Sequence, residues 1–131
     1  MGMLGNGNFE QDGALNFVWQ EVQKPLIQKV QSVVVKPVLA EADEPDSGPI
    51  VAAVEILALL SEHVNAAPPK PDLVALWKAT FLNSWDHTAS DVIFRPEDVI
   101  ERRSVITATF DRLERLSHRF HQQDAEQSNE G

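Results

Sequence analysis

The sequence is distinguished first by what it lacks, because none of its 131 residues is a cysteine. Disulfide bonds, thiolate zinc sites and a cysteine nucleophile are therefore excluded. The start of the chain has no basic region followed by an apolar run, so no secretory signal is expected. The longest apolar run, "IVAAVEILALL", is too short to span a bilayer and is interrupted by Glu55. These absences predict a cytoplasmic protein without a membrane-spanning segment.

Positive charge is also scarce, since 11 Lys and Arg stand against 20 Asp and Glu, for a net charge of −9. A field of that sign repels phosphate backbones and argues against nucleic-acid binding, whereas it suits a basic protein partner. The charge is sorted along the chain, because all six arginines fall in residues 95–121, against five acids. We expect this nearly neutral last segment to dock on the acidic remainder.

Apolar residues recur at three- and four-residue spacing in four segments, as one face of a helix requires. The predicted helices cover residues 12–35, 49–65, 72–85 and 96–121. Pro25 lies inside the first of them and should kink that helix or split it in two. The segment 86–95, "DHTASDVIFR", is predicted to be a loop.

These segments predict an all-α fold, a single-domain bundle of about four to five helices over residues 1–121, with no substantial β-sheet. The stretch "NAAPPKP" is expected to form an extended linker, because each proline biases the residue before it away from helix. Residues 122–131, "QQDAEQSNEG", are polar and lack apolar anchors, which predicts a disordered acidic tail.

The opening stretch "GNGNFEQDG" suggests a dinucleotide-binding fingerprint only superficially. Glu10 stands in place of the third glycine, no strand precedes the motif, and no lysine follows it. The glycines are instead expected to permit positive φ angles and to turn the chain sharply. Phe9 should then be buried beside the central helix, while Asn8, Glu10 or Asp12 caps or complements the first helix.

Glu55 is the one carboxylate set in an apolar run, and Glu62 follows seven residues later on nearly the same side of the helix. This spacing favours a narrow exposed stripe. A buried Glu55 paired with an arginine such as Arg103 is the alternative, and burial would raise the pKa of its carboxyl group.

A metal-dependent helical hydrolase is the alternative prediction of function. Three of its candidate donors fall within six residues, and a divalent ion could use them if the loop folds round it. The full candidate set is Glu55, Glu62, Asp86, His87 and Asp91. No HExxH motif, calcium-loop spacing or paired-carboxylate motif accompanies it, so no metal, cofactor or catalytic residue is assigned.

The segment "GNGNFEQDGALNFV" resembles the opening of the bacterial domain-of-unknown-function family 4259, in which a glycine-rich start precedes a Phe-led acidic cluster and an Ala-Leu helix. The match lies in Gly5, Gly7, Phe9, Glu10, Asp12, Ala14 and Leu15. The central "AAVEILALL" and the later helices also fit, so the resemblance covers most of residues 1–120. Gly13 replaces what is usually another acid, and Leu4 stands where the family often has Trp. The resemblance implies a small cytosolic bacterial protein and brings no established activity.

The acidic composition and the lack of a catalytic constellation predict a non-enzymatic protein–protein interaction module. Its partner would be a second copy of the chain, or a basic protein such as a toxin that it neutralises. No nucleic acid, membrane or cofactor is expected as a partner. The residues expected to bind are Gly5, Gly7, Phe9, Glu10, Asp12 and Glu55.

Overall fold

The computed structural model describes residues 7–130, with side chains described as far as Gln122. Within that range every regular element is a helix or a helical turn, and no β-strand occurs. In chain order the elements are a 3₁₀ turn Asn8–Glu10, α1 Asp12–Phe17, a π-helical segment Val18–Gln23, α2 Lys24–Val35, a 3₁₀ turn Pro37–Ala40, α3 Ser47–Val64, α4 Pro71–Val92 and α5 Pro96–Glu130. The predicted all-α single-domain bundle is confirmed.

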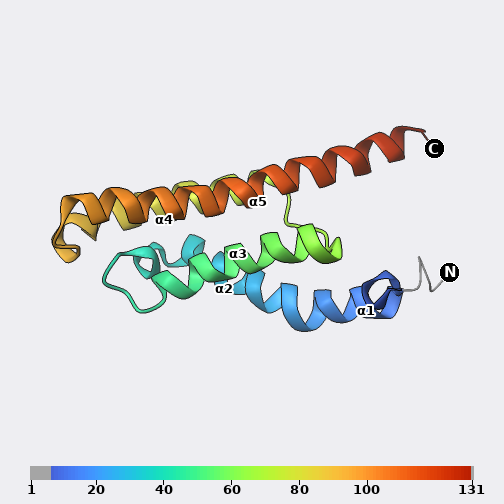
Figure 1. Ribbon diagram of the computed structural model, residues 1–131, viewed down its shortest axis with the longest axis horizontal. Coiled ribbons are helices and arrows are strands. Elements are labelled where there is room, and N and C mark those ends of the chain that lie inside the picture. Colours follow the sequence, from blue (N-terminus) through green and yellow to red (C-terminus); the bar gives the residue numbers. More distant parts are fainter. Residues whose placement is uncertain (1–6, 131) are drawn as a thin grey trace.

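The bundle has two layers, with α4 and α5 packed over α2 and α3 (Figure 1). α2 contacts both α3 and α4, and α5 contacts both as well, so four helices enclose one core. Each of them contributes side chains that are fully buried at the centre, among them Val30, Val54, Trp77, Phe81 and Phe110. The rings of Phe81 and Phe110 lie 5.6 Å apart between centroids, which joins α4 to α5 directly.

The first predicted helix is split at the expected place. A π-helical segment, Val18–Gln23, separates α1 from α2, and Pro25 lies in the first turn of α2. Proline lacks an N–H donor, and its ring clashes with the carbonyl four residues earlier. The wider π turn just before it is a common way for a helix to absorb such a break. The split is therefore confirmed.

α3 has 18 residues and a mean hydropathy of 1.4. By length and composition alone it is long and apolar enough to cross a membrane, a criterion that the core helix of a soluble protein also meets. Ile50, Val54 and Leu57 are buried in the bundle. α3 ends at Asn65, which has a φ of 56° and is the one described non-glycine residue in the left-handed region. Asparagine tolerates that conformation and commonly ends helices in this way.

The proline-rich linker between α3 and α4 has no regular secondary structure, and side chains of other elements hydrogen-bond to it along its length. Prolines contribute no N–H, so the hydrogen bonds of the linker have to reach its carbonyl groups. Gln23 Nε2 donates to Ala67 O at 2.8 Å, His121 Nε2 lies 2.9 Å from Pro68 O, and Ser117 Oγ donates to Pro69 O. These bonds join the linker to the π-helical segment and to α5.

α4 is longer than predicted, since it runs from Pro71 to Val92 and does not end near Trp85. The prediction of a loop after Trp85 is therefore wrong. The buried stripe continues one turn later at Ala89, which is 1% exposed. Thr88 also receives a hydrogen bond from the N–H of Ala42, at 2.9 Å. Alanine and threonine carry a weak hydrophobic signal, and the polar residues on either side of them are exposed, so the sequence shows little hydrophobic periodicity there.

α5 begins at Pro96 as predicted, and proline is favoured in a first helical turn. Its helical backbone continues to Glu130, across residues for which the sequence predicts a disordered tail. The tail is rich in Gln and Glu, which are favourable helix formers, so helical backbone does not require packing of the tail.

Candidate functional site

The N-terminal turn is built differently from the expectation. Gly5 lies outside the described residues, and Gly7 has a φ of −74°, so the turn makes no use of a positive φ at Gly7. The backbone N–H of Gly7 donates to Glu10 Oε2 at 2.8 Å. A Cβ at Gly7 would lie 3.0 Å from that oxygen, so the missing side chain leaves room for the carboxylate. Asp12 begins α1, where the helix dipole favours an anion, and the N-cap of α1 is Gln11.

Phe9 is not buried beside the central helix, because 45% of its surface is exposed. Its ring lies at the rim of a depression of about 320 Å3, whose other lining residues are Glu10, Leu15, Glu62, His63, Val64 and Asn65. The turn closed by Glu10 therefore brings Phe9 to the end of α3 and leaves it half covered. Val18, only 3% exposed, supplies the buried apolar contact of this part of the chain.

Glu55 and Glu62 are both exposed on α3, which confirms the predicted stripe. Glu62 accepts two hydrogen bonds from Arg112 on α5, at 2.7 Å from Nε and 2.6 Å from Nη2. These bonds lower the pKa of Glu62 below its ordinary value. The Glu62 hydrogen bond, and to a smaller extent the charge of Glu55, raise the pKa of Arg112. The alternative, a buried Glu55 paired with Arg103, does not form, because Glu55 is exposed and Arg103 pairs with Asp86.

Arg103 pairs with Asp86 on α4, with Nε–Oδ1 and Nη2–Oδ2 distances of 2.8 and 3.0 Å. This fork raises the pKa of Arg103. A second bridge between the same helices joins Lys78 Nζ to Asp111 Oδ1 at 2.5 Å. The Arg103–Asp86 and Arg112–Glu62 pairs dock arginines of the last segment on acidic residues of α4 and α3, as expected, whereas the Lys78–Asp111 bridge has the opposite polarity.

The candidate metal ligands are not brought to one place. Glu62 and Asp86 each have both carboxylate oxygens occupied by an arginine. Asp86 and His87 are neighbours on a helix, where successive side chains point about 100° apart, and not on a loop that could fold round an ion. Among the described side chains, no three of His, Asp or Glu gather as a cation site would require.

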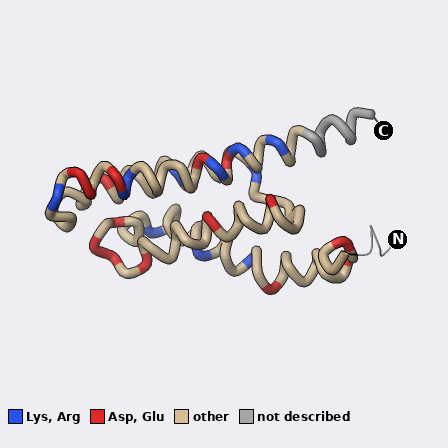
Figure 2. Tube along the Cα trace, in the orientation of Figure 1, with Lys and Arg blue, Asp and Glu red and all other residues tan. Residues whose placement is uncertain are grey.

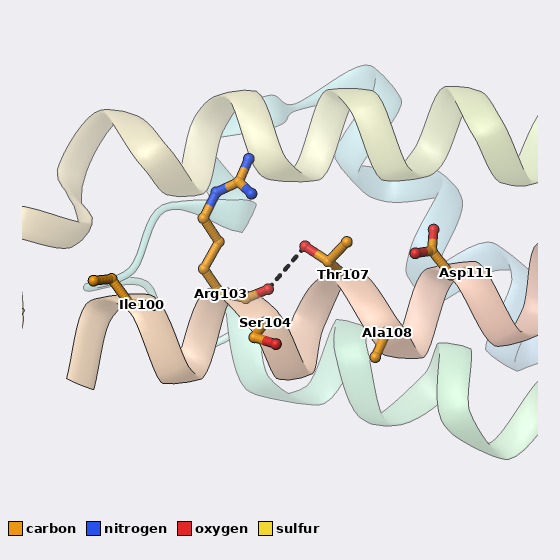
Figure 3. A pocket seen from close by; sticks show the side chains of 6 residues that line it. All are labelled: Ile100, Arg103, Ser104, Thr107, Ala108 and Asp111. Atoms are coloured by element: carbon orange, nitrogen blue, oxygen red, sulfur yellow. Dashed lines mark hydrogen bonds between the residues drawn. The ribbon is translucent and has the colours of Figure 1, made fainter. Parts of the chain in front are cut away.

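A shallow trough of about 470 Å3 runs along α5, and all its lining residues come from that helix (Figure 3). They are Ile100, Arg103, Ser104, Thr107, Ala108 and Asp111. Figure 3 shows Arg103 and Asp111 directed toward α4, and the Thr107 hydroxyl donates to the Arg103 carbonyl at 2.8 Å. The two charged residues of the trough are paired with Asp86 and Lys78. The trough therefore presents no unpaired acid or base for chemistry.

Acidic residues are concentrated at one end of the bundle, in residues 41–46 and 91–101, which we call the acidic end (Figure 2). These two segments hold eight acids and one base, Arg95. The Ala42–Thr88 hydrogen bond holds the first segment against α4, close to the second. Asp46 is paired with Lys29 at 2.7 Å. Sequence reasoning missed this surface because about 45 residues separate its two parts; the run "EADEPD" was its only local signal.

No family model, no curated protein and no solved structure matches this chain. The resemblance to domain-of-unknown-function family 4259 therefore stays a prediction from the residues of the opening segment.

Proposed function

We propose that the protein is a non-enzymatic, cytoplasmic interaction module that binds a positively charged protein, such as a toxin that it neutralises. The observation that carries this proposal is the acidic end, where two distant segments place eight acids against one base. Complementary charge accelerates association and disfavours partners of the wrong sign. A basic protein is the partner that such a surface suits.

The ion pairing of the other carboxylates supports a binding role for the protein over a catalytic one. The carboxylates best placed for chemistry, Glu62 and Asp86, are engaged by Arg112 and Arg103 in forked ion pairs between helices. A carboxylate with both oxygens engaged by a guanidinium group is a poor proton donor or metal ligand, and the pKa of Glu62 is lowered as well. The acids of the acidic end lie mostly outside such pairs.

Native mass spectrometry of the protein recovered from lysate of its native host tests the proposal. We expect a complex with a basic polypeptide that dissociates as salt is raised, because exposed charge pairs are screened. Asp43→Asn with Glu44→Gln should reduce recovery of the complex. Glu21→Gln with Asp72→Asn is the matched control, since it removes the same charge elsewhere on the surface. Recovery of a bare monomer under every condition would refute the proposal.

A further inference from the structure

The connection between α4 and α5 has a geometry that turns one aromatic ring outward. α4 ends at Val92 and α5 begins at Pro96, so only three residues join them. The backbone of Ile93 is extended, and Phe94 follows at a bend in the chain. Arg95 precedes Pro96, which biases Arg95 toward extended backbone. Ile93 packs against the core, whereas 97% of the Phe94 surface is exposed to solvent.

Phe94 belongs to a larger apolar surface at this tip. Ile100 is 71% exposed and Val92 is 47% exposed. The tip also has a depression of about 280 Å3, lined by Ser90, Ile93, Phe94, Pro96, Val99 and Ile100. An apolar patch rimmed by polar residues is typical of a protein-binding surface, and an aromatic ring is the usual anchor at its centre.

The rim of the apolar surface is acidic. Asp91 precedes Val92, and Glu97 and Glu101 are one helical turn apart on either side of Ile100 in the sequence. None of these three acids forms an ion pair with any side chain described in the structure. Arg95 is the one base in the same stretch. The tip therefore combines an uncovered aromatic ring with unpaired negative charge.

We propose that the α4–α5 tip is the docking site for a cationic segment of a partner protein that carries bulky apolar side chains. This inference rests on the proposed function and assigns it a surface. Phe94 and Ile100 bury their side chains against the apolar residues of the partner, and Asp91, Glu97 and Glu101 pair with its Lys or Arg side chains. Charge decides between occupants, because a second copy would bring like charges together and an anionic membrane would repel the rim.

A random-peptide library, displayed and selected on the full-length protein, tests this site directly and does not require the partner to be identified. We expect the selected peptides to be enriched in Lys or Arg and in bulky apolar residues. Phe94→Ala should weaken their binding about thirty-fold, as loss of a hot-spot anchor does. Asp91→Asn with Glu97→Gln should weaken binding at low salt and have less effect at high salt. Phe17→Ala, which truncates a ring 59% exposed on α1, should leave binding unchanged.

Four results would overturn the docking site. They are selected peptides without excess positive charge, binding that survives Phe94→Ala, no selected peptide at all, and a wild-type dimer in sedimentation that Phe94→Ala dissociates. Cationic binding that survives Phe94→Ala but is lost with Asp43→Asn and Glu44→Gln would overturn only the docking site. The proposed function itself fails if no cationic peptide binds and native mass spectrometry returns a bare monomer.

Discussion

The two connections that flank α4 differ in the burial of their apolar residues and in whether their polar groups have partners. In the linker before α4, Ala66 and Pro68 are buried, and three successive carbonyls are hydrogen-bonded by side chains of other elements. In the connection after α4, Phe94 is almost fully exposed, and the acids beside it have no ion-pair partner among the described side chains. The first connection stabilises the fold. The second is anchored to the core by Ile93 alone and leaves Phe94 uncovered, which is why we assign Phe94 to binding.

The largest expected effect is the difference in stability between two separate variants, one that truncates a phenylalanine in the core and one that truncates a phenylalanine at the tip. Phe110→Ala should lower the free energy of unfolding by about 3–5 kcal/mol, because Phe110 is fully buried and its loss leaves a cavity. Phe94→Ala should change it by less than about 0.5 kcal/mol, as exposed substitutions do. Urea denaturation followed by circular dichroism measures both. Equal losses would show that the tip is part of the core.

Next in size is the loss of one hydrogen bond from the linker. Ser117 is fully buried and donates to the Pro69 carbonyl. Ser117→Ala should cost about 1–3 kcal/mol, since it leaves a carbonyl without its partner. Ser90→Ala, an exposed serine at the tip, is the matched control and should be nearly neutral. Thermal melts that shift by the same amount for both variants would contradict the contrast between the connections.

A smaller effect is expected from the pH dependence of the Glu62–Arg112 pair. The pKa of Glu62 is lowered in the folded protein from an ordinary value of 4.5, so its charged form stabilises the fold. That contribution is fully present above the ordinary pKa and is lost as pH falls through the lowered one. Glu62→Gln should therefore flatten the loss of stability below about pH 4.5. Arg112→Gln should flatten it in the same way, because it removes the group that lowers the pKa of Glu62.

The smallest expected effect is that of added metal. Manganese or zinc should leave the melting temperature unchanged, because a ligand that does not bind the native state cannot stabilise it. Elemental analysis of the purified protein should find no stoichiometric metal. A rise in melting temperature on adding metal that Asp91→Asn abolishes, together with bound metal in the purified protein, would favour the hydrolase alternative. The acidic end would then be a metal site and not a protein-binding surface.

Much of the fold could be predicted, whereas little of the candidate site could. The sequence correctly predicted the interruption near Pro25, the non-helical linker before α4 and the start of α5 at Pro96, since proline acts on its nearest neighbours in any context. The exposure of Glu55 also followed from spacing along one helix. Phe9 and the end of α4 were misjudged because both depend on contacts with distant elements. The sequence "VIFRP" places Phe94 as an apolar residue in a helix break. The predicted break covered residues 86–95, whereas only residues 93–95 separate α4 from α5.

The sequence by itself determined that this chain is helical, where most of its helices begin, and that it is acidic. Those properties depend on side-chain periodicity and on the local constraints of proline, which act over a few residues. Only the tertiary structure decided which acids are paired and which phenylalanine stays uncovered. Arg112 meets Glu62 across 50 residues, and residues 41–46 meet the end of α4 through a bond that spans 46. Such pairings follow from how the helices pack against one another, because packing alone brings residues that are distant in the chain within reach of a hydrogen bond.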